Sequence, residues 1–169
     1  MNSIQPCPIP AGASLESYSK RGSYTDCYSV SIQRTVTQSE FVEAFYTTTV
    51  FKVERFLLAT VLSLPSTDAE ATLLASGKVD RFAAWSVEQR MSDQLLLAAG
   101  PTRSWLMVSA IGEPAETGTR LYFGSAVVPT RQGRNRTAVM GWQFHALLGF
   151  HKLYSRILLR AAARKLRNI

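Results

Sequence analysis

The stretch that decides the fold runs from Arg103 to Val128 and reads RSWLMVSAIGEPAETGTRLYFGSAVV. It contains two apolar runs, at 103–111 and 119–128, on either side of the polar segment GEPAETG. Apolar runs of this length that are separated by Gly and Pro are typical of β-strands joined by a turn. The stretch therefore predicts two adjacent antiparallel strands. The first run is apolar at both parities, so the pattern leaves open which of its side chains face inward.

A second hairpin is predicted immediately upstream. FAAWSVEQR (82–90) alternates in polarity, MSD forms a turn, and QLLLAA (94–99) returns as the second strand. Further upstream, TDCYSVSIQ (25–33) also alternates, as a half-buried strand does. The chain thus predicts one strand near the N-terminus and four consecutive strands in its second half.

The residues between 33 and 82 have a helical period. The first helix begins at Thr37, and Glu40 three residues later completes a capping box. The second covers VFKVERFLLATVLSL (50–64). Glu54 and Arg55 interrupt its apolar stretch, and we expect a solvated turn of helix there, the alternative being that one of them is a polar group facing the cavity. A third, short helix starts with a polar cap and ends at Gly77.

The C-terminal segment, from Thr137 to about Leu166, predicts a long helix. Four cations recur every four positions along it: Lys152, Arg156, Arg160 and Arg164. Residues at this spacing stay on one side of a helix. We expect this basic stripe to face water and the side with His151 and Tyr154 to face the sheet.

The charge of the chain is uneven. Residues 117–169 hold ten Lys and Arg and no acid, whereas residues 1–116 hold nine Lys and Arg and twelve acids, a net −3. Such asymmetry is typical of a solvated basic helix face, and equally of a protein drawn weakly to anionic membrane or nucleic acid.

Composition and length predict one folded domain. The chain has 169 residues, of which 46% are hydrophobic, as in folded soluble proteins. Residues 1–23 are rich in Pro, Gly and Ser, and we expect a flexible N-terminal arm there, followed by a single domain over 24–169. The sequence shows no secretory signal and no apolar run of the roughly twenty residues that span a membrane, so we expect a cytoplasmic protein.

These elements together predict an α+β fold, a curved antiparallel sheet wrapped around a long C-terminal helix, with two or three helices inserted after the first strand. Four stretches resemble the START-like (SRPBCC, helix-grip) superfamily, most closely its bacterial branches of unknown function: DRFAAWSVEQRMSDQLLL, RSWLMVSA, GTRLYFGSAVVP and FHALLGFHKLYSRILLRAA. The resemblance covers residues 24–166. It implies a cavity between the sheet and the C-terminal helix that holds an apolar ligand, and a core with more strands than the five predicted here.

The candidate site residues are few. Trp85, Trp105 and Tyr122 lie on three successive predicted strands, so they form either one wall of an apolar pocket or plain core. His151 and Tyr154 share a helix face, where they can orient the polar head of a ligand, or else serve the structure alone. In an enzyme, His151 would be the acid or base and Tyr154 a stabilising group. The sequence has no metal-binding spacing and no nucleotide-binding or nucleophile motif, so we expect no metal and no cofactor.

Three functions stay open at this point. The first is binding of a small hydrophobic or amphipathic ligand in the cavity, for which the five candidate residues would line the site. The second is a cyclase, dehydratase or isomerase on the same scaffold. The third is a protein whose basic stripe docks on anionic membrane or nucleic acid.

Overall fold

The structure is a computed structural model that describes residues 3–62, 65–112, 117–128 and 141–168, with side chains described except at 54, 57–62 and 141–151. Seven strands form one antiparallel sheet in the order β1-β2-β7-β6-β5-β4-β3. The strands are β1 (Gln5–Pro6), β2 (Tyr24–Ile32), β3 (Arg81–Phe82), β4 (Trp85–Arg90), β5 (Gln94–Ala99), β6 (Thr102–Ile111) and β7 (Gly118–Val127). The helices are α1 (Glu16–Lys20), α2 (Gln38–Tyr46), α3 (Thr49–Leu62), α4 (Asp68–Ala75) and α5 (Gly141–Arg167).

The predicted α+β class and the helix-grip layout are confirmed. The five predicted strands correspond to β2, β4, β5, β6 and β7, and α2, α3 and α4 are inserted after β2. The capping box at the start of α2 is present, because Thr37 Oγ accepts from Glu40 N–H at 3.2 Å and Glu40 Oε2 accepts from Thr37 N–H at 2.8 Å. Strands β1 and β3 were not predicted, because each has only two residues, too few to show an alternation of apolar and polar side chains.

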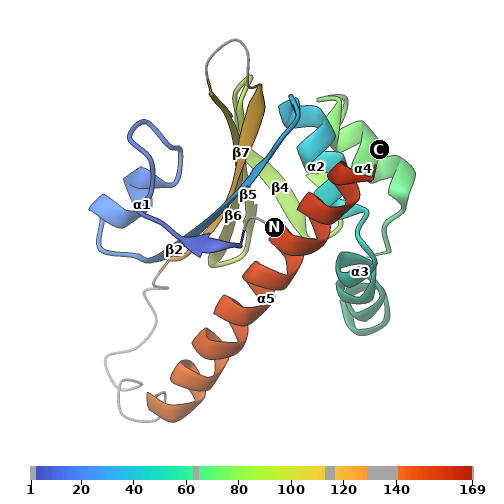
Figure 1. The fold of residues 1–169 in the computed structure, drawn as a ribbon. Helices are drawn as coiled ribbons and strands as arrows, with labels where there is room; N and C mark the ends of the chain where they lie inside the picture. The colour runs from blue at the N-terminus through green and yellow to red at the C-terminus, as the bar shows by residue number, and fades with distance from the viewer. Residues whose placement is uncertain (1–2, 63–64, 113–116, 129–140, 169) are drawn as a thin grey trace.

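Both faces of the sheet are covered. Figure 1 shows α5 and α2 against one face, here called the inner face, and α1 against the other, the outer face. The inner core joins the sheet to α2 and α5, and its α5 members are Leu158, Leu159, Ala162, Ala163 and Leu166. A separate outer core contains Leu15, Tyr18, Cys27, Leu96 and Trp105. Successive residues of a strand therefore alternate between two buried environments.

The basic stripe of α5 faces outward, as the sequence predicts. Lys152, Arg156, Arg160 and Arg164 are all exposed. Leu153 and Ile157, between these cations, are exposed too, Leu153 by 56%. No helix in the described part of the chain combines the length and the apolar content needed to cross a bilayer.

In the described part of the N-terminal segment, Ala13, Leu15 and Tyr18 pack on the outer face of the sheet, and Ile4 joins the inner core. Leu15 is fully buried, and the backbone N–H of Ser14 donates to Gln94 Oε1 at 2.9 Å. The indole N–H of Trp105 donates to the same oxygen at 2.9 Å. Leu15 fits because residue 124 is glycine: a Cβ there would lie 2.7 Å from a Leu15 methyl carbon. The segment is thus part of the packed structure.

A polar cluster fastens α1 to the sheet. The Tyr18 hydroxyl donates to the carboxylate of Glu88 and accepts from Arg103 Nε at 3.0 Å. Arg103 also pairs with Glu88 at 2.6 Å and lies over the Tyr18 ring, 5.3 Å from its centroid. Burial and the Glu88 carboxylate raise the pKa of Tyr18, so its hydroxyl keeps its proton.

A second polar cluster joins α3 to the start of α4. Arg55, expected on a solvated turn, is buried, and its guanidinium donates to Ser66 Oγ, Ser66 O and Asp68 Oδ1 at 3.0, 2.6 and 2.6 Å. Lys52 pairs with the other oxygen of Asp68 at 2.6 Å. Arg55 also lies over the Phe82 ring. The helix keeps a buried cation there because every part of the guanidinium has a partner.

Replacement of Leu15 by Ala tests the packing of the N-terminal segment. Leu15→Ala should lower the free energy of unfolding by about 2 to 4 kcal/mol, since it leaves a cavity above Gly124. The exposed Leu153→Ala is the matched control and should change it by less than about 0.5 kcal/mol. Chemical denaturation measures both. Equally small changes in the free energy of unfolding for both variants would mean that Leu15 is not packed against the sheet.

The Asp68 carboxylate gives stability a defined pH dependence. Its bonds to Lys52 and Arg55 lower the pKa of Asp68 in the folded protein. The carboxylate therefore contributes fully to the free energy of unfolding above its unfolded pKa of about 3.9, and this contribution is lost as the pH falls through the lower pKa of the folded state. Asp68→Asn should cost about 0.5 to 1 kcal/mol at pH 7, because the carboxylate is 48% exposed, and this difference should vanish well below pH 4. Asp80→Asn, at a more exposed pair, should cost less. If the difference in stability between wild type and Asp68→Asn persisted unchanged in acid, the ionised Asp68 carboxylate would not be its source.

Candidate functional site

The inner face carries a pocket of about 660 Å³ where α2, α3 and α5 meet the sheet. Its described lining is mainly aromatic and aliphatic: Phe45, Tyr46, Val50, Phe51, Val53, Trp85, Phe123 and Leu158. The rings pack on one another, with centroids 4.8 Å apart for Phe45–Phe123 and for Tyr46–Phe51. Tyr46 and Phe51 meet edge to face and Phe45 and Phe123 are tilted, so packed rings form an apolar wall.

Ser155 is a buried polar group in this wall. It lines the pocket and is 1% exposed, and its Oγ has no hydrogen-bond partner in the described part of the chain. A buried hydroxyl without a partner costs about 1 to 3 kcal/mol, so such groups normally meet water or a ligand. Ser155 is therefore the point in the described lining where a bound molecule can form a hydrogen bond.

The helical period explains the position of Ser155. It lies three and four residues before Leu158 and Leu159, and so on the same buried face of α5. We expected His151 and Tyr154 on this face and did not single out Ser155. The signal was present in the sequence, because Ser155 continues the apolar stripe as its one small polar member.

Two of the predicted site residues border the pocket. Trp85 lies in its aromatic wall, and Tyr154 is half-buried at its α5 side. The backbone of His151 belongs to α5, but its side chain lies outside the described residues. The roles predicted for His151 and Tyr154, in ligand orientation or in catalysis, stay predictions.

Trp105 and Tyr122 lie elsewhere, which corrects their placement in one wall with Trp85. Trp105 belongs to the outer core and Tyr122 packs against it, with ring centroids 6.2 Å apart. On β6 it is Ser104 that reaches the pocket instead. The reason is parity: neighbouring residues of a strand point to opposite faces, and this strand is apolar on both.

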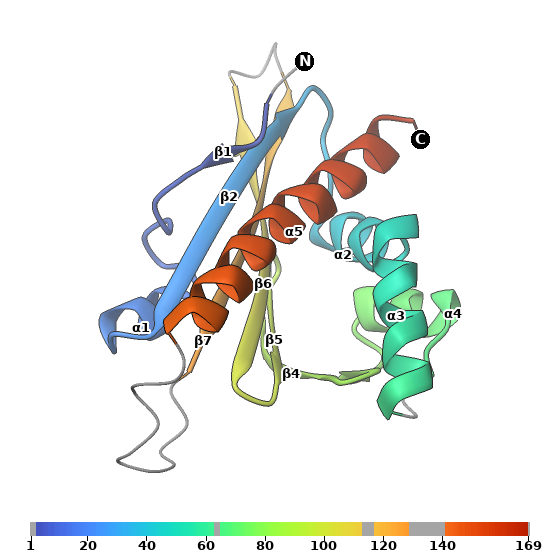
Figure 2. The same cartoon turned by 90° about the horizontal axis from the view of Figure 1, so that it is seen from below.

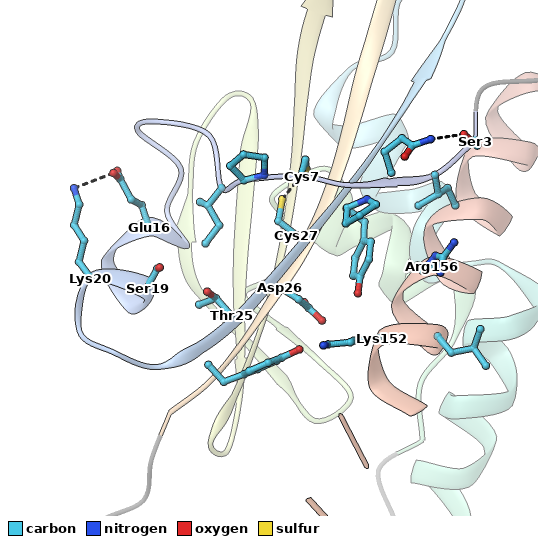
Figure 3. A pocket seen from close by; sticks show the side chains of 18 residues that line it. Ser3, Cys7, Glu16, Ser19, Lys20, Thr25, Asp26, Cys27, Lys152 and Arg156 are labelled. Carbon is cyan, nitrogen blue, oxygen red and sulfur yellow. Dashed lines mark hydrogen bonds and ion pairs between the residues drawn. The ribbon is translucent and has the colours of Figure 1, made fainter. Parts of the chain in front are cut away.

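A larger groove, of about 1130 Å³, lies along the edge of β2 between α5 and the N-terminal segment (Figure 3). Lys152 and Arg156 of α5 face Tyr24, Asp26 and Tyr28 of β2 across it. Burial raises the pKa of Tyr24 to about 12, so its phenol is neutral at physiological pH. About half of the groove's lining is polar or charged, a larger share than in the inner pocket, so the groove suits a small apolar ligand less well.

Comparison with known proteins gives no family. No family model and no curated protein matches the chain. Among solved structures, the chain is similar to CalU16 from Micromonospora echinospora, with 12% sequence identity and a TM-score of 0.31 over 98% of this chain and 92% of that one. A likeness at this level carries no argument about fold or function, and the site stands on its own geometry.

Proposed function

We propose that the protein binds a small hydrophobic or amphipathic molecule in the pocket between the sheet and α5. One observation carries the proposal: a space of about 660 Å³ walled by aromatic rings is bordered by the buried hydroxyl of Ser155, which has no hydrogen-bond partner among the described residues. This volume falls in the range of about 300 to 1,000 Å³ that small-molecule sites occupy. The resemblance to the START-like superfamily implies a cavity in the same place.

Each part of the pocket has a distinct role in this proposal. The aromatic wall buries the hydrocarbon part of the ligand, and this burial favours binding by roughly 25 cal/mol per Å² of apolar surface removed from water. Ser155 exchanges a hydrogen bond with a polar atom of the ligand, and this fixes its orientation. Tyr154 lies at the α5 side of the pocket, where it can meet the polar end of an amphipathic molecule.

Substitution at Ser155 tests the proposal. The probe is N-phenyl-1-naphthylamine, a neutral molecule that fluoresces in apolar surroundings. Ser155→Leu should fill the pocket and weaken its binding by about tenfold or more, equivalent to about 1.4 kcal/mol. Ser155→Ala keeps the space and removes only the hydroxyl, so binding should stay within about threefold. Fluorescence titration gives the affinities.

The outer side of α5 supplies the control. Ile157→Ala, at an exposed position two residues away, should leave the probe affinity unchanged. Thermal unfolding of Ser155→Leu shows whether there is room, because an added side chain destabilises an interior that is already packed. A variant that unfolds many degrees lower, or that binds the probe as well as wild type, would refute the pocket as the binding site.

The exposed face of α5 supports a second candidate function, docking on anionic phospholipid. Lys152, Arg156 and Arg160 alternate there with the exposed Leu153 and Ile157. Cations beside exposed aliphatic side chains suit a membrane interface, where the charges meet lipid head groups and the aliphatic groups enter the acyl boundary. This arrangement favours lipid over nucleic acid, which offers no apolar layer to Leu153.

Vesicle sedimentation tests the second candidate. Vesicles of phosphatidylcholine and phosphatidylserine should retain the protein at about 0.1 M salt and release much of it at about 1 M, as the screening length falls from about 10 Å to 3 Å. Reversal of three charges, with Lys152→Glu, Arg156→Glu and Arg160→Glu, should weaken retention by at least about tenfold. Lys78→Glu with Arg81→Glu is the control, on exposed cations elsewhere. Retention by nucleic acid without any vesicle binding would contradict it.

A further inference from the structure

Two cysteines face each other across the edge of the sheet. The β1–β2 register pairs Gln5 with Ser29 and Pro6 with Tyr28, so Cys7 comes opposite Cys27. The backbone N–H of Cys7 donates to the Cys27 carbonyl at 3.0 Å, and the two Sγ atoms lie 3.4 Å apart (Figure 3). A hydrogen-bonded antiparallel pair has its Cα atoms about 5.5 Å apart, within the range of about 4.4 to 6.8 Å that disulfides span. The backbone is already positioned for a bond.

The two sulfurs differ in access. Both cysteines line the groove beside β2, but Cys7 is half-buried whereas Cys27 is 5% exposed and belongs to the outer core. The hydrogen bond with Cys27, helped by Ser29 and the Arg120 cation and opposed by burial, lowers the pKa of Cys7 to about 6. The same bond and burial raise the pKa of Cys27. Cys7 is therefore the accessible thiolate, and Cys27 is a buried thiol beside it.

We propose that Cys7 and Cys27 form a redox-active pair that reacts with a low-molecular-weight disulfide, such as oxidised glutathione, and closes into an intramolecular disulfide. The pair lies on the outer face, apart from the inner pocket, so this proposal does not depend on ligand binding.

The reaction has two exchange steps. The Cys7 thiolate attacks one sulfur of oxidised glutathione; a Cys7–glutathione bond forms, the glutathione S–S bond breaks, and the first glutathione leaves as a thiolate. Cys27 then gives its proton to solvent and its sulfur attacks Cys7; the Cys7–Cys27 bond forms and the second glutathione leaves. Two protein thiols lose two electrons in total, and one oxidised glutathione becomes two reduced glutathiones.

The bond would fasten the N-terminal segment at its start. Strand β1 has only two paired residues. Further along the segment, Ile9, Ala13 and Leu15 pack on the outer core and Ser14 bonds Gln94. A Cys7–Cys27 bond closes the chain between these cysteines into a loop and restricts the unfolded state. The segment then stays on the sheet and keeps its wall of the groove in place.

Mass spectrometry of the intact reduced protein treated with oxidised glutathione is the main test. Wild type should end as a monomer that has lost two hydrogen atoms and carries no glutathione. Its midpoint of thermal unfolding should rise by about 5 to 10 °C, and reduced dithiothreitol should reverse both changes. Wild type that stays unmodified, keeps a glutathione adduct or forms disulfide-linked dimers would overturn the proposal.

Single variants assign the two roles. Cys27→Ala should accumulate one stable glutathione on Cys7, and Cys7→Ala should leave Cys27 at least about tenfold slower to react, since it is buried. Equal rates for the two cysteine variants would show that Cys7 is not the preferred point of entry and would contradict the assigned roles. The wild-type measurement holds even if Cys27→Ala folds poorly.

Discussion

The long pairing of β2, β7 and β6 determines which side chains lie together on each face of the sheet. These strands are in register over nine residues between β2 and β7 and over ten between β7 and β6. On the inner face this register aligns Leu106, Phe123 and Tyr28, and one residue further along it aligns Trp105, Gly124 and Cys27 on the outer face. A slip of one residue would exchange the two rows and bury the wrong side chains on both faces. The pocket and the cysteine pair follow from the same alignment.

The sequence predicted the elements well because each had a clear period. Alternation in 25–33 and in the two hairpins predicted the strands, and Thr37 with Glu40 predicted the start of α2. The sequence did not show to which face of the sheet Trp105 points, because odd and even positions of its strand are both apolar. Leu15, which covers Trp105 on the outer face, lies ninety positions earlier in the chain. Residues 1–23 are rich in Ser, Gly and Pro, and their composition did not show that their few apolar side chains cover the sheet.

The candidate site was predicted in outline and missed in part. Trp85 and Tyr154 border the pocket because a strand residue and a helix residue with inward periodicity converge there. Ser155 was missed because a serine on an apolar stripe has no distinct pattern, and only the structure shows that its hydroxyl is buried and unpartnered. The pocket itself depends on side-chain size: Ser104 and Ser155 are too small to fill the space that Phe45 and Phe123 border, and packed rings do not move to fill it.

Strand β6 serves both faces of the sheet. Ser104 borders the inner pocket, whereas Arg103 beside it has the parity of Trp105, and its guanidinium binds Tyr18 of α1 and Glu88 of β4 on the outer side. An arginine held by a carboxylate and a phenol has little freedom, so this cluster holds α1 firmly on the strand that also supplies Ser104. The N-terminal segment is therefore more than a cover for the outer core, because Tyr18 attaches it to β4 and β6 and the pairing next to Cys7 attaches it to β2.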